Sequence, residues 1–321
     1  MNNIDCVIEN LIDLHKHYTV RDGFVFTSIT EPANVYDALV LRYPEMCDCH
    51  TPKVGFSTRT LQECIDLINQ YNIKKVLIIA ENIEFLQFCP SLECLEIVPS
   101  DTAEDAFDYS PLYELKKITE LNCKTVYGNI GQFSTNIDYS KVKGLKKVTI
   151  CDDGHMNYSD AFTLESLILS NVPQLIDLQN LTSLCNLNSL DIVNCGIQSL
   201  SGIEELTKLR QLNLGYCRKL NDVSDLIYIC CNLNQLSIEN CNKIKDFNFL
   251  YQMIGLVRLH LEGKNNLEDL YFLKQMANLR ELFMWMNVLN GDITPCVGIP
   301  YVSIANRKHY NMKNIDLPKL K

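Results

Sequence analysis

The stretch from residue 164 to residue 285 repeats one short pattern six times. Each copy opens with a six-residue segment of the form L-x-x-L-x-Φ, in which Φ is Leu, Ile or Met. The segments begin at Leu164, Leu187, Leu209, Leu233, Leu256 and Leu279, so they recur every 22 to 24 residues. A fixed period in this range indicates a stack of similar units, each of which packs only against its neighbours.

The spacing within each segment predicts a short β-strand. Side chains of a strand alternate between two faces, so the apolar residues turn inward and the residues between them turn outward. Further apolar pairs, such as Ile197/Leu200 and Ile203/Leu206, would pack a short return of about two helical turns or a 3₁₀ segment. Three repeats have cysteine at the ninth position, where we expect a small buried side chain: Cys195, Cys217 and Cys241.

This pattern resembles the leucine-rich-repeat family, and the repeat length is similar to that of the bacterial internalin-like class. The ninth-position cysteines also resemble the repeats of ubiquitin-ligase adaptors. The resemblance implies an α/β leucine-rich-repeat solenoid, curved, with a parallel sheet on its concave face. It also implies that the chain binds a protein ligand and is not an enzyme.

The solenoid is expected to extend beyond the six regular repeats, over residues 73–304. Earlier segments with the strand pattern start at Ile73, Leu92, Ile118 and Leu145, and a last one starts at Ile299. Residues 1–72 do not fit the period and contain helical patterns over residues 4–14 and 60–72. We interpret them as an irregular N-terminal cap, with a small functional domain as the alternative. Residues 305–321 form a polar C-terminal tail.

The charge and cysteine content restrict the partners and the compartment. The chain has a formal net charge of −10 and a pI of about 5.1, which disfavours nucleic acid and anionic membranes as partners. We find no signal-peptide pattern and no apolar run long enough for a membrane span. The 15 cysteines therefore suggest reduced thiols in the cytoplasm. Neither a cofactor nor an oligomeric state can be assigned.

Three small clusters contain residue types that can support catalysis or metal binding. Cys47, Cys49 and His50 could contribute to a zinc site, but no second ligand pair follows at the usual spacing. Asp152, Asp153 and His155 could act in acid–base chemistry, and His15 lies close to His17. A solvated turn and an exposed helix face explain the last two sets better. A metal- or thiol-dependent enzyme around Cys47, Cys49 and His50 remains an alternative.

The outward-facing strand residues are the preferred candidates for a binding site. Phe283 and Trp285 lie two residues apart on one face, and an aromatic pair near arginines is typical of a binding hot spot. The alternative is that the C-terminal tail covers both rings. An alternative function is that of an adaptor or an immunity or effector protein that uses its N-terminal region. The candidate protein-binding residues are Arg210, Tyr216, Glu239, Arg258, His260, Arg280, Phe283 and Trp285.

Overall fold

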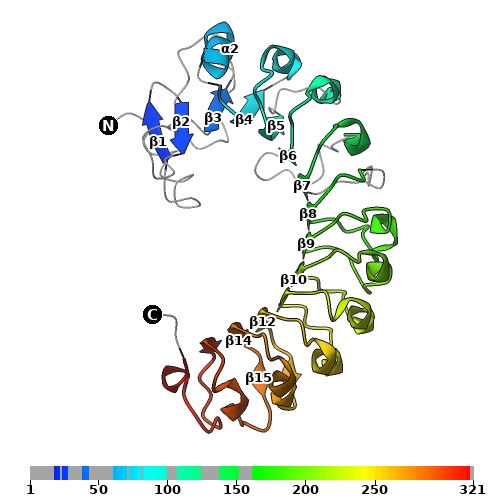
Figure 1. Ribbon diagram of the computed structural model, residues 1–321, viewed down its shortest axis with the longest axis vertical. Coiled ribbons are helices and arrows are strands. Elements are labelled where there is room, and N and C mark those ends of the chain that lie inside the picture. Colours follow the sequence, from blue (N-terminus) through cyan, green and yellow to red (C-terminus); the bar gives the residue numbers. More distant parts are fainter. Residues whose placement is uncertain are drawn as a thin grey trace. The chain divides into compact units, whose positions relative to one another are not determined.

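The structure is a computed structural model, and it divides the chain into two compact units, Met1–Asn157 and Tyr158–Lys321 (Figure 1). It describes residues 18–21, 24–27, 38–42, 61–70, 72–80, 82–99, 107–123, 137–151 and 161–318. The clusters at residues 15–17, 47–50 and 152–155, and the predicted helix over residues 4–14, lie outside these described residues.

The first unit contains five strands in parallel register, each paired with the next along the chain. They are β3 (Ala38–Arg42), β4 (Lys75–Ala80), β5 (Cys94–Pro99), β6 (Glu120–Cys123) and β7 (Lys147–Cys151). The parallel strands therefore begin before residue 73, because the apolar run at Ala38–Arg42 also pairs with β4. An antiparallel pair, β1 (Tyr18–Arg21) and β2 (Phe24–Thr27), and the helix α2 (Leu61–Gln70) precede β4.

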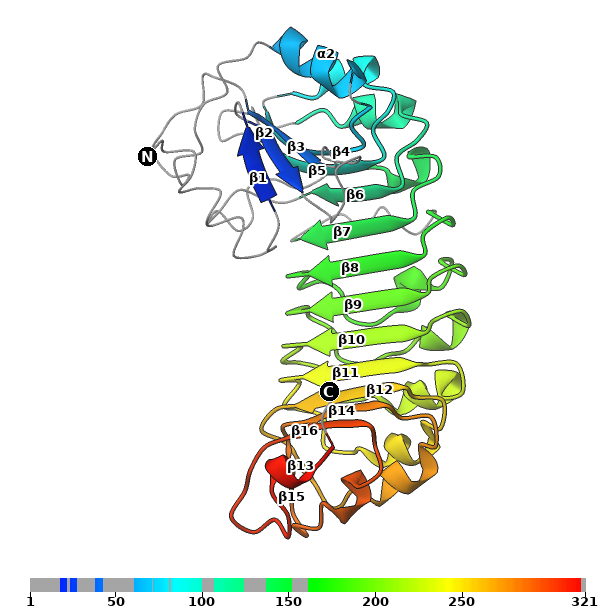
Figure 2. The ribbon, with the colours of Figure 1, turned by 60° about the vertical axis from the view of Figure 1, so that its left-hand side comes forward.

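The second unit contains the six regular repeats and the last predicted strand. Seven strands pair in parallel in chain order, as Figure 2 shows for β8 to β12. They are β8 (Ser166–Ser170), β9 (Ser189–Val193), β10 (Gln211–Gly215), β11 (Gln235–Glu239), β12 (Arg258–Glu262), β14 (Glu281–Met284) and β16 (Tyr301–Ile304). Two short strands, β13 (Asn266–Leu267) and β15 (Asn287–Val288), form a second parallel pair.

The repeat pattern builds the core as predicted. In β10, Leu212 and Leu214 are buried while Gln211 and Asn213 are half-buried on the other face. Most returns carry 3₁₀ helices that bury part of their apolar residues against the sheet. In η6 (Ser224–Ile229), for example, Leu226 and Ile229 are buried while Ile227 and Tyr228 are exposed. In the second unit these 3₁₀ helices are η4 (Gln179–Leu181), η5 (Ile203–Glu205), η6, η7 (Asn248–Gln252), η8 (Tyr271–Gln275), η9 (Thr294–Cys296) and η10 (Asn314–Asp316). In the first unit they are η1 (Glu84–Phe88), η2 (Ser110–Glu114) and η3 (Tyr139–Lys141).

The turns after β8 to β11 use the eighth and ninth residues of the repeat together. The eighth residue takes a left-handed conformation in Asn171, Asn194, Tyr216 and Asn240, with φ between 52° and 57°. Asparagine tolerates this conformation better than most residues, so only Tyr216 is unusual in this set. The ninth-position cysteines are buried, as predicted. Their thiols also point at main-chain carbonyls, such as Cys217 Sγ at 3.5 Å from the oxygen of Ile192.

Aspartates start most returns of the second unit. Their carboxylates accept the backbone N–H two residues later, which begins each 3₁₀ turn. The residues are Asp177, Asp222, Asp246, Asp269 and Asp292.

The C-terminal tail closes the end of the second unit. The backbone N–H of Val302 in β16 donates to the oxygen of Pro318, so the tail pairs with the last strand. The buried hydroxyl of Tyr310 accepts the N–H of Val288 at 2.9 Å and lies 3.4 Å from the oxygen of Met286. Trp285 nevertheless stays 45% exposed, so the described part of the tail leaves much of this residue accessible.

Candidate functional site

The sheet of the second unit has an outer face, which we define as the face opposite the 3₁₀ helices. Its side chains form rows because the strands pair in register. The middle row runs Asp191, Asn213, Ser237, His260 and Phe283 from β9 to β14. Residues about 23 positions apart in sequence therefore become direct neighbours on one surface.

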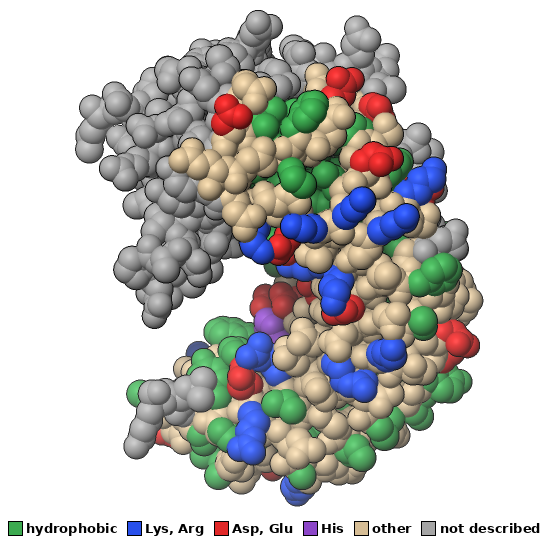
Figure 3. Space-filling view, turned by 45° about the horizontal axis from the view of Figure 1, so that its top comes forward, with side chains coloured by type: hydrophobic (Ala, Val, Ile, Leu, Met, Phe, Trp, Pro, Cys, Tyr) green, Lys and Arg blue, Asp and Glu red, His purple; other side chains and the backbone are tan. Residues whose placement is uncertain are grey.

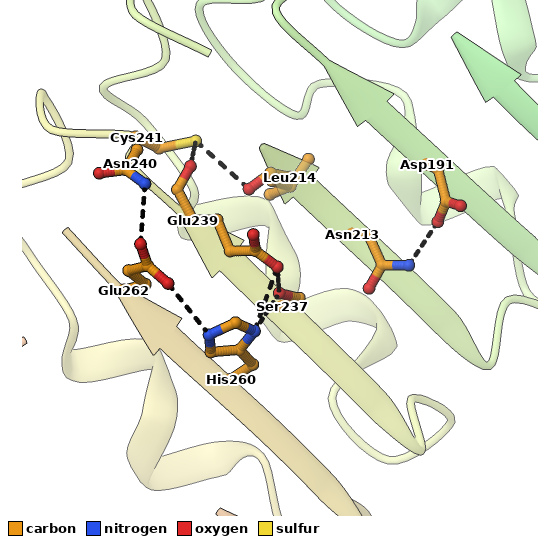
Figure 4. Close-up of polar contacts among 9 residues, drawn as sticks. All are labelled: Asp191, Asn213, Leu214, Ser237, Glu239, Asn240, Cys241, His260 and Glu262. Carbon is orange, nitrogen blue, oxygen red and sulfur yellow. Dashed lines mark hydrogen bonds and ion pairs between the residues drawn. The ribbon is translucent and has the colours of Figure 1, made fainter. Parts of the chain in front are cut away.

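A polar network occupies this face at β11 and β12 (Figure 4). Ser237 donates a hydrogen bond to Glu239 Oε1 at 2.7 Å, and His260 Nδ1 lies 3.1 Å from the same oxygen. The other ring nitrogen of His260 lies 3.6 Å from Glu262 Oε2. Asn240 donates to Glu262 Oε1 at 3.2 Å. The network thus places one imidazole between two carboxylates from adjacent strands.

The two carboxylates face each other in the strand register. Like charges at directly opposed positions repel each other across a sheet. A neutral imidazole has one N–H and can donate to only one of the glutamates, whereas an imidazolium can donate to both. His260 lies between two carboxylates and carries at most one positive charge, so it relieves this repulsion only in part.

Aromatic rings continue the outer face across the strands toward β16, the last strand of the sheet. The centroid of the Phe283 ring lies 5.5 Å from that of His260 and 5.3 Å from that of Tyr301. Both contacts are tilted, which is a favourable geometry for aromatic pairs. Trp285 follows β14 and is half-exposed beside this run.

The predicted arginines lie at the opposite end of the strands from Trp285. Arg258 forms an ion pair with Glu281 at 2.7 Å, and hydrogen bonding to this carboxylate raises the pKa of Arg258 above its ordinary value. Arg210 directs its guanidinium to the main-chain oxygen of Leu209 at 3.1 Å. Arg280 is exposed just before β14. The structure therefore does not surround Phe283 and Trp285 with arginines.

The structure instead brings three of the predicted residues together: Glu239, His260 and Phe283. Tyr216 and Trp285 lie at the same carboxyl end of the sheet, each at the end of its strand. Ser237, Asn240 and Glu262 complete the network and were not predicted as site residues. Their positions in the repeat match those of the predicted residues, so alignment of the repeats in register could have indicated them.

Other surfaces offer weaker candidates. A cleft of about 250 Å³ lies on the return side and is lined by Asp222, Asp246, Asn248 and Phe249 among others. Its two carboxylates already accept backbone N–H groups of the 3₁₀ turns, so they have a structural role. On the face seen in Figure 3, basic and acidic side chains are interspersed among uncharged ones.

Within the described ranges, no group of three His, Cys, Asp or Glu side chains could hold a metal ion. None of the helices in the same part of the chain has the length and hydropathy needed to cross a bilayer.

Comparisons with known proteins agree with the repeat architecture. A family model of two leucine-rich repeats matches residues 185–228. No curated protein sequence matches the chain. Among solved structures, an internalin, inlF of Listeria monocytogenes, is 17% identical, with coverage of 75% of this chain and 76% of the internalin, and a TM-score of 0.53.

Two other proteins of the same organism are more distant in structure. Internalin C2 is 22% identical, with coverage of 56% of this chain and 75% of its own, and a TM-score of 0.42. A functional domain of InlJ that includes a cysteine ladder is 16% identical, with coverage of 67% and 43% and a TM-score of 0.44. At these identities the similarity establishes the fold alone, and inlF carries that comparison.

Proposed function

Because this chain is a leucine-rich-repeat protein with the solenoid fold of the internalins, we propose that it recognises another protein through the outer face of its second unit. Stacked repeats present an extended sheet surface, and this fold generally serves as a scaffold for protein interaction. The chemistry is therefore binding, with no catalytic step assigned to any residue.

The half-exposed ring of Trp285 is the observation that carries this proposal. Tryptophan is enriched among the residues that contribute most to binding energy at protein interfaces. Two residues earlier in the chain, the Phe283 ring lies between the rings of His260 and Tyr301, so other aromatic groups occupy the same face. A ring presented by a strand loses little conformational freedom when a partner binds.

The electrostatics of the outer face support a protein partner over nucleic acid. Glu239 and Glu262 lie close together on this face, and Arg258 is neutralised by Glu281. Phosphate groups would meet repulsion at the two glutamates. The net charge of −10 acts in the same direction over longer distances.

The test is affinity capture from a lysate of the native host with three baits. Wild type, Trp285→Ala and Tyr228→Ala are compared after circular dichroism shows that all three fold. Tyr228 is a matched control because it is a more exposed aromatic residue on η6, on the return side. A partner retained by wild type and Tyr228→Ala should lose about thirty-fold or more in affinity for Trp285→Ala. Equal binding to all three baits would contradict the use of the outer face.

We also propose a cytoplasmic location, which the three buried ninth-position cysteines support. The thiols of Cys195, Cys217 and Cys241 lie within 3.6 Å of main-chain oxygens, a role that needs the reduced form. A reducing compartment preserves this state. Subcellular fractionation of the host tests the location, and recovery of the protein only outside the cytoplasm would contradict it.

A further inference from the structure

We infer that the segment bound by this face is basic, and that one of its Lys or Arg side chains lies between Glu239 and Glu262, flanked by Tyr216 and Trp285. This inference rests on the proposed function and names the class of partner. We call these four residues the carboxyl-end surface, because each lies at or just after the end of its strand.

The four residues follow one another across neighbouring strands. Tyr216 follows β10, Glu239 ends β11, Glu262 ends β12 and Trp285 follows β14. The backbone N–H groups of Tyr216 and Trp285 donate to the oxygens of Glu239 and Leu261, so both continue the parallel ladder. At about 4.8 Å per strand, the surface spans roughly 14 Å, which suits a few residues of an extended segment.

One neighbouring position leaves space beside the first carboxylate. Gly215 pairs with Glu239 in the register and has no side chain. A Cβ added there would meet the methyl groups of Val193 only at 3.7 and 3.8 Å, which is ordinary contact. The flank of Glu239 toward β10 is therefore free of a bulky side chain at this position.

The charges on this surface favour a cation. Among the described residues, the ion-pair partner found for both Glu239 and Glu262 is His260. One imidazole carries at most a single positive charge, so His260 cannot neutralise both carboxylates. An ammonium or guanidinium group has enough N–H donors to serve both carboxylates and would remove their mutual repulsion.

The flanking rings suit the rest of a Lys or Arg side chain. Tyr216 and Trp285 are 49% and 45% exposed, so both can contact a ligand. Aromatic faces attract cations, and the aliphatic stems of Lys and Arg pack well on such rings. An acidic segment would instead be repelled, and an apolar one would leave the glutamates desolvated without a partner.

The test uses a library of random twelve-residue peptides displayed on phage and selected on the full chain. Enriched peptides should contain Lys or Arg, and their synthetic forms should bind less tightly as NaCl rises from about 50 to 500 mM. The double variant Glu239→Gln with Glu262→Gln should bind them about five-fold more weakly. Glutamine preserves the shape of glutamate, and circular dichroism verifies folding.

A matched variant controls for net charge. Glu205→Gln with Glu268→Gln removes two exposed carboxylates of the return side and should bind the peptides like wild type. The selected peptides could lack basic residues, bind Trp285→Ala weakly and bind the double glutamate variant like wild type. This result would overturn the inference while the proposed function stands. Peptides that bind Trp285→Ala as well as wild type would speak against both. A selection without enriched peptides would overturn the basic-segment inference, and the capture experiment then decides the proposed function.

Discussion

Gly196 allows two successive returns to approach each other, and its replacement by alanine should be strongly destabilising. A Cβ at this position would lie 1.9 Å from the main-chain oxygen of Pro173 and 2.7 Å from its carbonyl carbon. Neither atom belongs to a side chain that can rotate away. The N–H of Gly196 also donates to the oxygen of Val172 at 3.0 Å, so the two segments are held together.

Replacing Gly215 by alanine should instead raise the free energy of unfolding. Its added Cβ would make only ordinary contact with Val193, and alanine restricts the unfolded chain more than glycine does. We expect Gly196→Ala to lose about 3 kcal/mol or more, since the clash requires the backbones to separate. Gly215→Ala should gain about 0.5–1 kcal/mol.

Urea unfolding followed by circular dichroism and by the fluorescence of Trp285, the only tryptophan, measures both variants. Both substitutions add the same methyl group in neighbouring repeats, so the difference reports the local geometry. Equal unfolding free energies for Gly196→Ala and wild type would refute the close approach of the returns. If Gly215→Ala lost as much unfolding free energy as Gly196→Ala, the fold would be destabilised by any added methyl group, and the close approach at Gly196 would not be the cause.

Four further predictions concern stability and thiol chemistry. Asn194→Val should cost about 2 kcal/mol in urea unfolding and Asn194→Gly clearly less, because φ is 52° there; equal costs would contradict a left-handed constraint. Tyr310→Phe should cost about 1–3 kcal/mol because it leaves the buried N–H of Val288 unpaired, whereas exposed Tyr228→Phe should be neutral. Backbone and side-chain hydrogen bonds from Ser224 lower the pKa of Asp222. The ionised carboxylate therefore stabilises the fold above about pH 4, and this stabilisation is lost as the pH falls through the lowered pKa. Asp222→Ala should lower the free energy of unfolding by about 1 kcal/mol at pH 7 and by less at pH 3, as measured by urea unfolding. Burial raises the pKa of Cys296 to about 12, so alkylation with iodoacetamide at pH 8, read by peptide mass spectrometry, should label exposed Cys231 and spare Cys296 until the chain unfolds.

The architecture was largely predictable because one rule recurs in every repeat. Apolar residues at the first, fourth and sixth positions placed β8 to β12, and the same rule placed β4 and β16. The left-handed turn at the eighth position was not predicted, although Asn171, Asn194 and Asn240 stand there. Asparagine tolerates a positive φ, so these eighth-position residues express the backbone requirement of the turn more directly than the ninth-position cysteines do.

The site was predictable only in part, because side-chain partners depend on register and rotamer. Arg258 was expected to be available for a ligand, yet Glu281 on the neighbouring strand binds it. That pair could be inferred only once the repeats were aligned in register. The direction of Arg210, which turns back to main-chain oxygens, depends on its rotamer and has no signal in the repeat pattern.

Two departures from the rules of the repeat occur at the same end of the sheet. Tyr216 takes a left-handed conformation that Asn171, Asn194 and Asn240 adopt at lower cost. On the adjacent strands, Glu239 and Glu262 face each other where opposite charges would be more stable. Functional sites often depart from the sequence preferences that the rest of a protein follows, and here two departures occur together. This coincidence is the reason to locate the proposed interface at the carboxyl end of the sheet, and it makes Tyr216, Glu239 and Glu262 the first residues to exchange.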